Sequence, residues 1–177
     1  MSNNTNIDFG SELNNHKVEF LLYPINWRKF KNLKSINIRK AHWKETKYLN
    51  DSGKDLNTNV NKINNRTGGI YIFVIKTGIL PSISEYLVYI GRAQYTTNHN
   101  LRVRVKKYYK EYMNDNERPK IVRMMTSWGN NLYLKYVEID DNDVITKLEA
   151  RLINTLLPPF NDEIPDKKIR KAIKAFK

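Results

Sequence analysis

The sequence contains no cysteine, and other features that identify common classes of protein are scarce. Without cysteine the chain can form no disulfide, no thiolate metal site and no cysteine nucleophile. The three histidines, His16, His42 and His99, are scattered, which argues against a histidine-based zinc site. No run approaches the roughly 18 apolar residues of a membrane span, and residues 1–6 lack the apolar core of a signal peptide. These absences predict a cytoplasmic protein that has no membrane segment.

Acidic residues are also few compared with basic ones. The 177 residues include 31 Lys and Arg but 18 Asp and Glu, which gives a net charge of +13 and a pI near 9.8. This balance favours a polyanionic partner, with a merely basic protein as the alternative. With 40% apolar residues, the chain can bury a core and is not a disordered polycation.

Two segments concentrate the positive charge. Between Arg28 and Lys47 there are eight basic residues and one acidic residue, and aromatic residues are interleaved with them. The segment from Lys167 to Lys177 adds six basic residues and no acidic one. Cations hold phosphates and aromatic rings stack on bases, although we expect most of these rings to lie in the core. In the first segment, the predicted contacts to nucleic acid are Arg28, Lys29, Arg39 and Lys40.

Residue patterns predict an α+β domain in the rest of the chain. Residues 69–75 and 86–90 are rich in β-branched and aromatic side chains, and the stretch between them contains turn-forming glycine, proline and serine. Residues 132–139 are expected to form a third strand. Apolar residues at helical spacing predict three helices, over residues 100–113, 120–128 and 144–156. This order of elements gives a small sheet with helices packed on it.

Two three-residue boxes lie on the predicted hairpin, and other polar landmarks follow them. Gly69-Ile70-Tyr71 and Tyr89-Ile90-Gly91 are followed by a basic helix with arginines, then by Glu149 in an apolar helix, then by Asn161. This order resembles the GIY-YIG nuclease superfamily over about residues 67–162. In size and layout the chain is most similar to the small type II restriction endonucleases of that family. The resemblance implies a three-stranded antiparallel sheet flanked by helices, here with an N-terminal extension.

The first 64 residues contain no motif that we can name. Residues 18–23 are expected to form a short strand or the start of a helix, residues 25–48 to be partly helical and residues 50–67 to be a loop. We therefore predict a basic, partly helical N-terminal region, a GIY-YIG catalytic domain and a basic C-terminal tail, over residues 1–64, 65–165 and 166–177.

Hydrolysis of a phosphodiester needs an activated water, stabilised charge on the phosphoryl oxygens, and protonation or metal capture of the leaving oxygen. The resemblance assigns a base-like role to Tyr71, with Tyr89 beside it on the paired strand. A free tyrosine has a pKa of about 10, so this role requires a cation or a metal-bound water nearby. The alternative is that both are half-buried strand residues.

An arginine on the first predicted helix is expected to hold the scissile phosphate, because its charge is fixed and its planar fork matches phosphate oxygens. The resemblance to the nuclease subunit of bacterial nucleotide excision repair selects Arg104, with Arg102 as the alternative on another face of the helix. Tyr108 follows Arg104 by one turn and is expected to point into the same cleft or to pack in the core. Some restriction enzymes of the family have a histidine there.

Glu149 is the only acidic residue between Asp143 and Asp162. The resemblance makes it the ligand of Mg²⁺, with Mn²⁺ as a substitute, since Mg²⁺ is commonly held by one carboxylate together with waters and substrate phosphate. Asn161 is expected to position Glu149 or to cap nearby backbone. A solvated carboxylate and a loop-forming asparagine are the alternatives.

Cations that border the two boxes and the first helix are further predicted contacts to nucleic acid: Lys76, Arg92, Arg102, Lys106 and Lys107. The leading hypothesis is a Mg²⁺-dependent DNA endonuclease of the restriction type, acting on double-stranded DNA. A palindromic site would call for a homodimer with two active sites. The alternatives are a mobile-element or repair nuclease, a nucleic-acid-binding protein with a decayed site, and a basic interaction protein.

Overall fold

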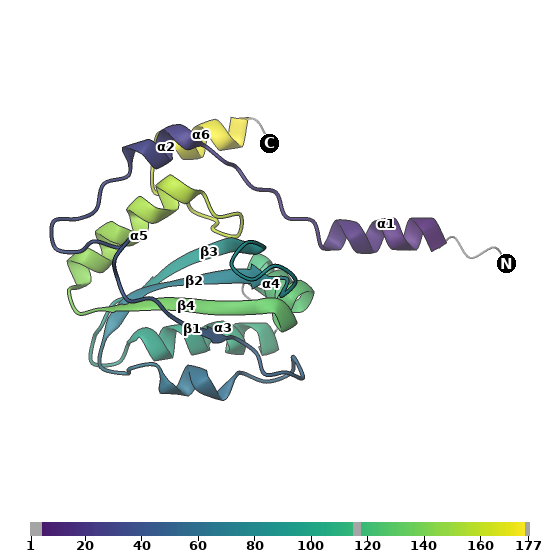
Figure 1. Ribbon diagram of the computed structural model, residues 1–177, viewed down its shortest axis with the longest axis horizontal. Helices are drawn as coiled ribbons and strands as arrows, with labels where there is room; N and C mark the ends of the chain where they lie inside the picture. Colours follow the sequence, from purple (N-terminus) through teal and green to yellow (C-terminus); the bar gives the residue numbers. More distant parts are fainter. Residues whose placement is uncertain (1–4, 115–117, 176–177) are drawn as a thin grey trace.

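The computed structural model describes residues 5–114 and 118–175, in which one antiparallel sheet has helices on both faces (Figure 1). Its four strands lie in the order β1-β4-β2-β3, and each neighbouring pair is antiparallel. The strands are β1 (Lys44–Lys47), β2 (Gly68–Lys76), β3 (Glu85–Ala93) and β4 (Leu132–Ile139). The predicted α+β class is confirmed, but the prediction of three strands is wrong, because β1 adds a fourth strand beside β4.

The helices account for most of the remaining chain. The predicted helices over residues 100–113, 120–128 and 144–156 are confirmed. Helices α1 and α2 lie in the N-terminal region that was expected to be partly helical, and α6 is additional. The α-helices are α1 (Thr5–Asn15), α2 (Pro24–Lys29), α3 (Leu101–Asn114), α4 (Pro119–Trp128), α5 (Asn142–Leu156) and α6 (Lys167–Ala175). Two short 3₁₀ helices are η1 (Thr58–Lys62) and η2 (Gly129–Asn131). Within the described residues, no helix is long and apolar enough to cross a membrane.

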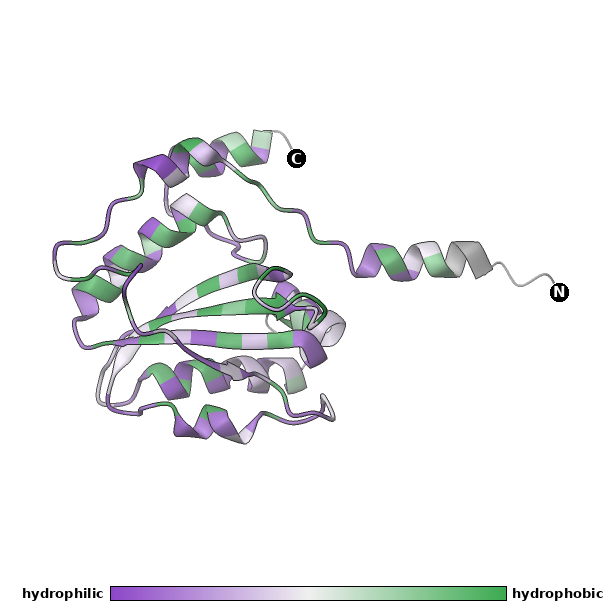
Figure 2. Ribbon diagram, viewed as in Figure 1, coloured by the Kyte–Doolittle hydropathy of each residue, from purple (hydrophilic) through white to green (hydrophobic). Residues whose placement is uncertain are grey.

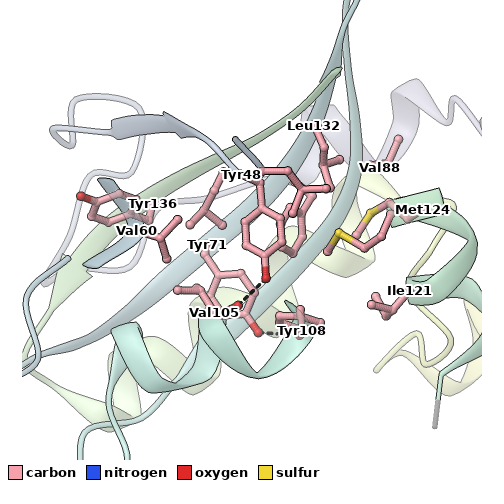
Figure 3. Packing of buried hydrophobic residues seen from close by; sticks show 14 of the residues in the cluster. Tyr48, Val60, Tyr71, Val88, Val105, Tyr108, Ile121, Met124, Leu132 and Tyr136 are labelled. Atoms are coloured by element: carbon pink, nitrogen blue, oxygen red, sulfur yellow. Dashed lines mark hydrogen bonds between the residues drawn. The ribbon is translucent and has the colours of Figure 1, made fainter. Parts of the chain in front are cut away.

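Two hydrophobic clusters hold the helices against the sheet. On one face, α3, α4 and η1 cover a cluster that includes Tyr48, Tyr71 and Tyr108 (Figure 3). On the other face, α5 packs its apolar side on Ile70 and Ile90. Strand β2 lies between both layers and is buried at all but two of its positions, which agrees with its mostly green colour in Figure 2. Burial on both faces explains why its sequence is a continuous apolar run.

The short edge strand β1 carries the sequence Lys-Glu-Thr-Lys and is joined to the sheet partly through ion pairs. Each strand contributes one residue to a charge row, in which Lys76 and Lys135 each pair with both Glu45 and Glu85. Their N–O distances lie between 2.7 and 3.2 Å. The row lies at the end of the β2–β3 hairpin where Lys76 pairs with Glu85.

The N-terminal region wraps around the body, whereas α1 projects away from it (Figure 1). Arg123 of α4 donates hydrogen bonds to the carbonyl oxygens of Asn15 and Lys17, and Asn26 of α2 donates one to Asn154 of α5. Residues 18–23 form neither a strand nor a helix, so that prediction is wrong. Residues 1–4 and 176–177, at the ends of the predicted terminal regions, lie outside the described residues.

Candidate active site

The two boxes face each other across the β2–β3 pair. Tyr71 lies opposite Gly91, and Phe73 lies opposite Tyr89. A Cβ atom at position 91 would clash with the side chain of Tyr71, including its hydroxyl oxygen. The glycine of the second box is therefore needed because the ring of the first-box tyrosine lies over it.

Three tyrosine hydroxyls form a hydrogen-bonded chain at this crossing. The hydroxyl of Tyr108, on α3, lies 2.7 Å from that of Tyr71 (Figure 3). It lies 2.9 Å from the hydroxyl of Tyr89. Tyr71 and Tyr108 are completely buried, and the ring of Tyr108 packs edge-on against both of the other rings. Tyr108 thus packs in the core, which is one of its two expected positions, and its hydroxyl joins the two box tyrosines.

Burial also controls the protonation of these tyrosines. It raises the pKa of Tyr71, Tyr89 and Tyr108 above the ordinary value of 10.0, since a buried phenolate loses its hydration. The positive charge of Arg104 opposes this rise in all three groups. At neutral pH the chain of hydroxyls is therefore uncharged. The charge of Arg104 makes proton loss easier from all three hydroxyls, and the charge of Arg118 also lowers the pKa of Tyr89.

Arg104 and Arg102 lie on different sides of α3. The Nε of Arg104 donates a hydrogen bond to the hydroxyl of Tyr71 at 3.1 Å, and its guanidinium lies 5.2 Å from the centre of the Tyr108 ring. The Nε of Arg102 instead donates to the carbonyl oxygen of Ile63. Of these two arginines, Arg104 is the one that reaches the tyrosine chain.

Glu149 approaches the same place from α5, whose N-terminus is capped by the side chain of Asp141. Its carboxylate lies 3.0 Å from the guanidinium of Arg92, and its side chain is 19% exposed. Burial raises the pKa of Glu149 above the ordinary value of 4.5, and the charges of Arg92 and Arg104 oppose that rise. The site therefore holds a carboxylate that is poorly hydrated and would gain from a nearby cation.

Asn161 ties the segment after α5 to the outer edge of β3. Its Oδ1 accepts a hydrogen bond from the Ile90 N–H at 2.9 Å, and its Nδ2 donates one to the Ile90 carbonyl at 2.8 Å. The backbone N–H of Phe160 donates to the Val88 carbonyl at 3.0 Å. Asn161 thus caps backbone, which is one of its two expected roles, and it fixes the strand that carries the second box.

These side chains border one cleft of about 790 Å³ at the β3 edge of the sheet, between α5 and the N-terminal ends of α3 and α4. Tyr71, Tyr89, Arg104, Glu149 and Asn161 all line it. His99 also lines the cleft, together with polar residues that sequence reasoning did not select: Gln94, Thr96, Arg118, Thr146, Asp162 and Glu163. They lie in loops and helix ends whose position against the sheet depends on tertiary packing.

The other predicted nucleic-acid contacts are more widely spread. Arg92 lines the cleft, whereas the remaining predicted contacts do not. Lys76 belongs to the charge row at the far end of the hairpin, and Lys106 donates a hydrogen bond to Asn61. Lys107 is half-exposed on α3. The cations of the N-terminal segment are exposed, on α2 and after it: Arg28, Lys29, Arg39 and Lys40.

The donor set of the cleft limits the kind of metal site that it can form. Among the described residues, no three His, Asp or Glu side chains lie close enough together to hold an ion by themselves. Mg²⁺ is commonly bound by one or two carboxylates together with waters and substrate phosphates. Glu149, which is poorly hydrated and borders an open cleft, fits that kind of binding.

Comparisons with models of protein families, with curated proteins and with solved structures give no match to this chain. The function therefore has to be inferred from the geometry and the charges of the cleft.

Proposed function

We propose that the protein is a metal-dependent endonuclease that hydrolyses phosphodiester bonds in DNA. The observation that supports this most strongly is one cleft lined by the two box tyrosines, Arg104 and Glu149, which come from four separate elements. The buried hydroxyl of Tyr108 joins the two tyrosines, and Arg104 donates to Tyr71. A net charge of +13 supports a polyanionic substrate. A restriction-type enzyme acting on duplex DNA is the form of this proposal that the resemblance favours.

In this proposal Tyr71 first passes its proton through Tyr108 to Tyr89, which releases one proton to solvent in the cleft, and the resulting Tyr71 phenolate accepts the proton of the attacking water. Tyr71 receives a hydrogen bond from Arg104, so its own proton is directed along the chain towards Tyr108. Because burial raises the pKa of all three hydroxyls, none is a base by itself at neutral pH. Arg104 reduces the cost of forming a phenolate, and a second cation near the cleft would reduce it further.

Arg104 and Arg92 have the chemistry to hold the phosphate. A guanidinium stays charged and can donate two parallel hydrogen bonds to phosphate oxygens. Arg104 keeps its terminal amino groups for this role, because its Nε is the atom bound to Tyr71. Arg92 lies against Glu149, so a phosphate next to that carboxylate would be within its reach.

Glu149 is the residue that would hold the metal. When bound, Mg²⁺ supplies charge stabilisation for the phosphoryl and leaving oxygens. The single carboxylate has the donor chemistry for this ion or for Mn²⁺, and a neighbouring cation would offset its poor hydration. Arg92 supplies part of that compensation when Glu149 is not bound to a metal.

Nicking of a supercoiled plasmid tests the proposal. The wild type should convert the plasmid to open-circle or linear DNA with Mg²⁺ or Mn²⁺ and should leave it intact with EDTA. Sequencing of the product ends then tests the restriction-type form, which predicts discrete ends rather than a smear. Salt-dependent binding without cleavage in any metal would instead favour a nucleic-acid-binding protein. The same assay with single-stranded DNA and RNA defines the substrate class.

A further inference from the structure

A buried carboxylate lies on α3 three residues after Tyr108, and it has no part in the mechanism described above. The side chain of Glu111, on α3, is 5% exposed, and within the described residues neither of its oxygens has a hydrogen-bond partner. Its charged neighbours are the Nζ of Lys107 at 3.8 Å and the Nε of Arg118 at 3.7 Å. A buried charge with such loose compensation is costly for the folded state.

Arg118, the residue before α4, connects this carboxylate to the cleft. Its guanidinium lies 5.6 Å from the centre of the Tyr108 ring, and the Arg104 guanidinium lies 5.2 Å from the same centre. Arg118 also lines the cleft together with Arg104 and Tyr89. Its Nε faces Glu111, and no described residue accepts a hydrogen bond from its terminal amino groups, which can therefore reach a ligand in the cleft.

Lys107 does not connect Glu111 to the cleft in this way. Its side chain is half-exposed on α3, and it is not among the residues that line the cleft. Glu111 therefore has one charged neighbour in solvent and one in the candidate active site. The contact with Arg118, which lines the cleft, offers a functional reason for burying this carboxylate.

We propose that Arg118 binds a second phosphate of the substrate strand and that Glu111 is a positioning residue that holds Arg118 in the cleft. This inference rests on the proposed function and adds a substrate contact to it. Arg104 and Arg118 both pack against the ring of Tyr108 and both line the cleft, so the two guanidinium groups present positive charge to one polyanionic strand.

The test measures DNA binding without metal, so that it does not depend on cleavage. The Kd of a short fluorescein-labelled duplex is measured over a series of salt concentrations for the wild type, Arg118→Ala, Glu111→Gln and the double variant. Arg118→Ala should raise Kd roughly tenfold at low salt and should lower the salt slope by about one. Lys110→Ala is the matched control, because Lys110 is an exposed cation of α3 that does not line the cleft.

The double variant separates positioning from a purely structural role. If Glu111 acts through Arg118, Glu111→Gln weakens binding in the wild type and has no further effect in Arg118→Ala. Additive losses of affinity would overturn the positioning role. The double variant removes both charges, so it leaves no unpaired buried carboxylate and should fold even if Arg118→Ala does not.

Two further results separate this inference from the proposed function. The inference would be overturned, even if the wild type cleaves DNA, by an Arg118→Ala variant whose Kd and salt slope are unchanged. If Arg118→Ala does not fold, the same result in the double variant would overturn it. A wild type that never cleaves DNA would overturn the proposed function, whereas a weaker Kd in Arg118→Ala would still support the phosphate contact. Arg118→Lys should recover part of the affinity, because it keeps the charge but not the fork.

Discussion

At the scale of single residues, two arginines on α3 that are two positions apart have different surroundings. Arg104 donates to Tyr71 in the cleft, and Arg102 donates to a backbone carbonyl away from it. The family resemblance selected Arg104 by its place in a motif, and the hydrogen bond to Tyr71 is an independent reason for the same choice. The two positions can therefore be compared directly.

Arg104→Ala is expected to reduce the cleavage rate much more than Arg102→Ala. A charge contact made mainly in the transition state typically supplies around 3 kcal/mol, or roughly two orders of magnitude in rate. Single-turnover cleavage of plasmid DNA measures both variants under the same conditions. An inactive Arg102→Ala together with an active Arg104→Ala would show that the wrong arginine has been assigned to the phosphate.

Gly91→Ala should destabilise the protein and disturb Tyr71. The new methyl group would occupy the space of the Tyr71 side chain, and overpacking of this kind typically costs about 1–3 kcal/mol of unfolding free energy. Urea denaturation measures the loss. Gly10→Ala is the control, since a Cβ atom there meets nothing within 4 Å and alanine favours the helix. Equal stability of both variants would contradict this account of the second box.

Glu149→Gln should be at least as stable as the wild type at pH 8 without metal. Burial raises the pKa of Glu149, so between pH 4.5 and that raised pKa the folded state holds a proton that the unfolded state has lost. The unfolding free energy of the wild type therefore falls, relative to the variant, as the pH rises through this window. Below pH 4.5 the difference disappears. Urea titrations at several pH values measure it, and a variant that becomes relatively less stable with rising pH would contradict the sign.

At the scale of elements, the sequence predicts what local patterns determine. The sequence shows clear apolar patterns in three strands and three helices, which were predicted close to their observed ends: β2, β3, β4, α3, α4 and α5. Strand β1 has no apolar residue, and its place in the sheet depends on pairing with β4 and on ion pairs. The same limit applies to the site. Its motif residues were found in the sequence, whereas Arg118 and Glu111 come together only through the packing of α3 and α4.

Residues 167–175 of the basic tail form helix α6, which lies at the surface of the protein. The side chain of Asp166 accepts hydrogen bonds from the Lys168 and Ile169 N–H groups at the start of α6, and none of the described residues of α6 is buried. The exposed cations on α2 and after it form a second basic group. Both groups are expected to contact DNA phosphates around the cleft, as cation density of this kind favours.

Deleting residues 168–177 should leave a folded protein with lower affinity for DNA, and the loss should be greatest at low salt. The core keeps all its contacts in this variant, whereas several phosphate contacts are lost. Changing Arg28, Lys29, Arg39 and Lys40 together to Ala should have a similar effect. Fluorescence anisotropy across a salt titration measures both variants. Unchanged DNA affinity in both variants would mean that residues 65–165 bind DNA without these cations.

At the scale of the whole molecule, the net charge of the chain and the position of the cleft both favour an extended polyanion as the substrate. The chain carries a net charge of +13, and the cleft at the edge of the sheet is lined by three arginines and Glu149. An opening at a sheet edge can admit an extended polymer. At the other end of the hairpin, Lys76 of the charge row is already bound in ion pairs with Glu45 and Glu85. A homodimer would bring two such clefts to one duplex, which sedimentation of the protein on DNA can measure.

The most direct test of the central claim compares the wild type with Glu149→Gln on long duplex DNA in excess Mg²⁺. The change removes the only carboxylate that the site is proposed to use for the metal, and it deletes one negative charge facing phosphate. We expect cleavage by the wild type, no detectable cleavage by the variant, and equal or tighter DNA binding by the variant without metal. Cleavage by Glu149→Gln at the rate of the wild type would contradict the claim that this cleft is a metal-dependent nuclease site.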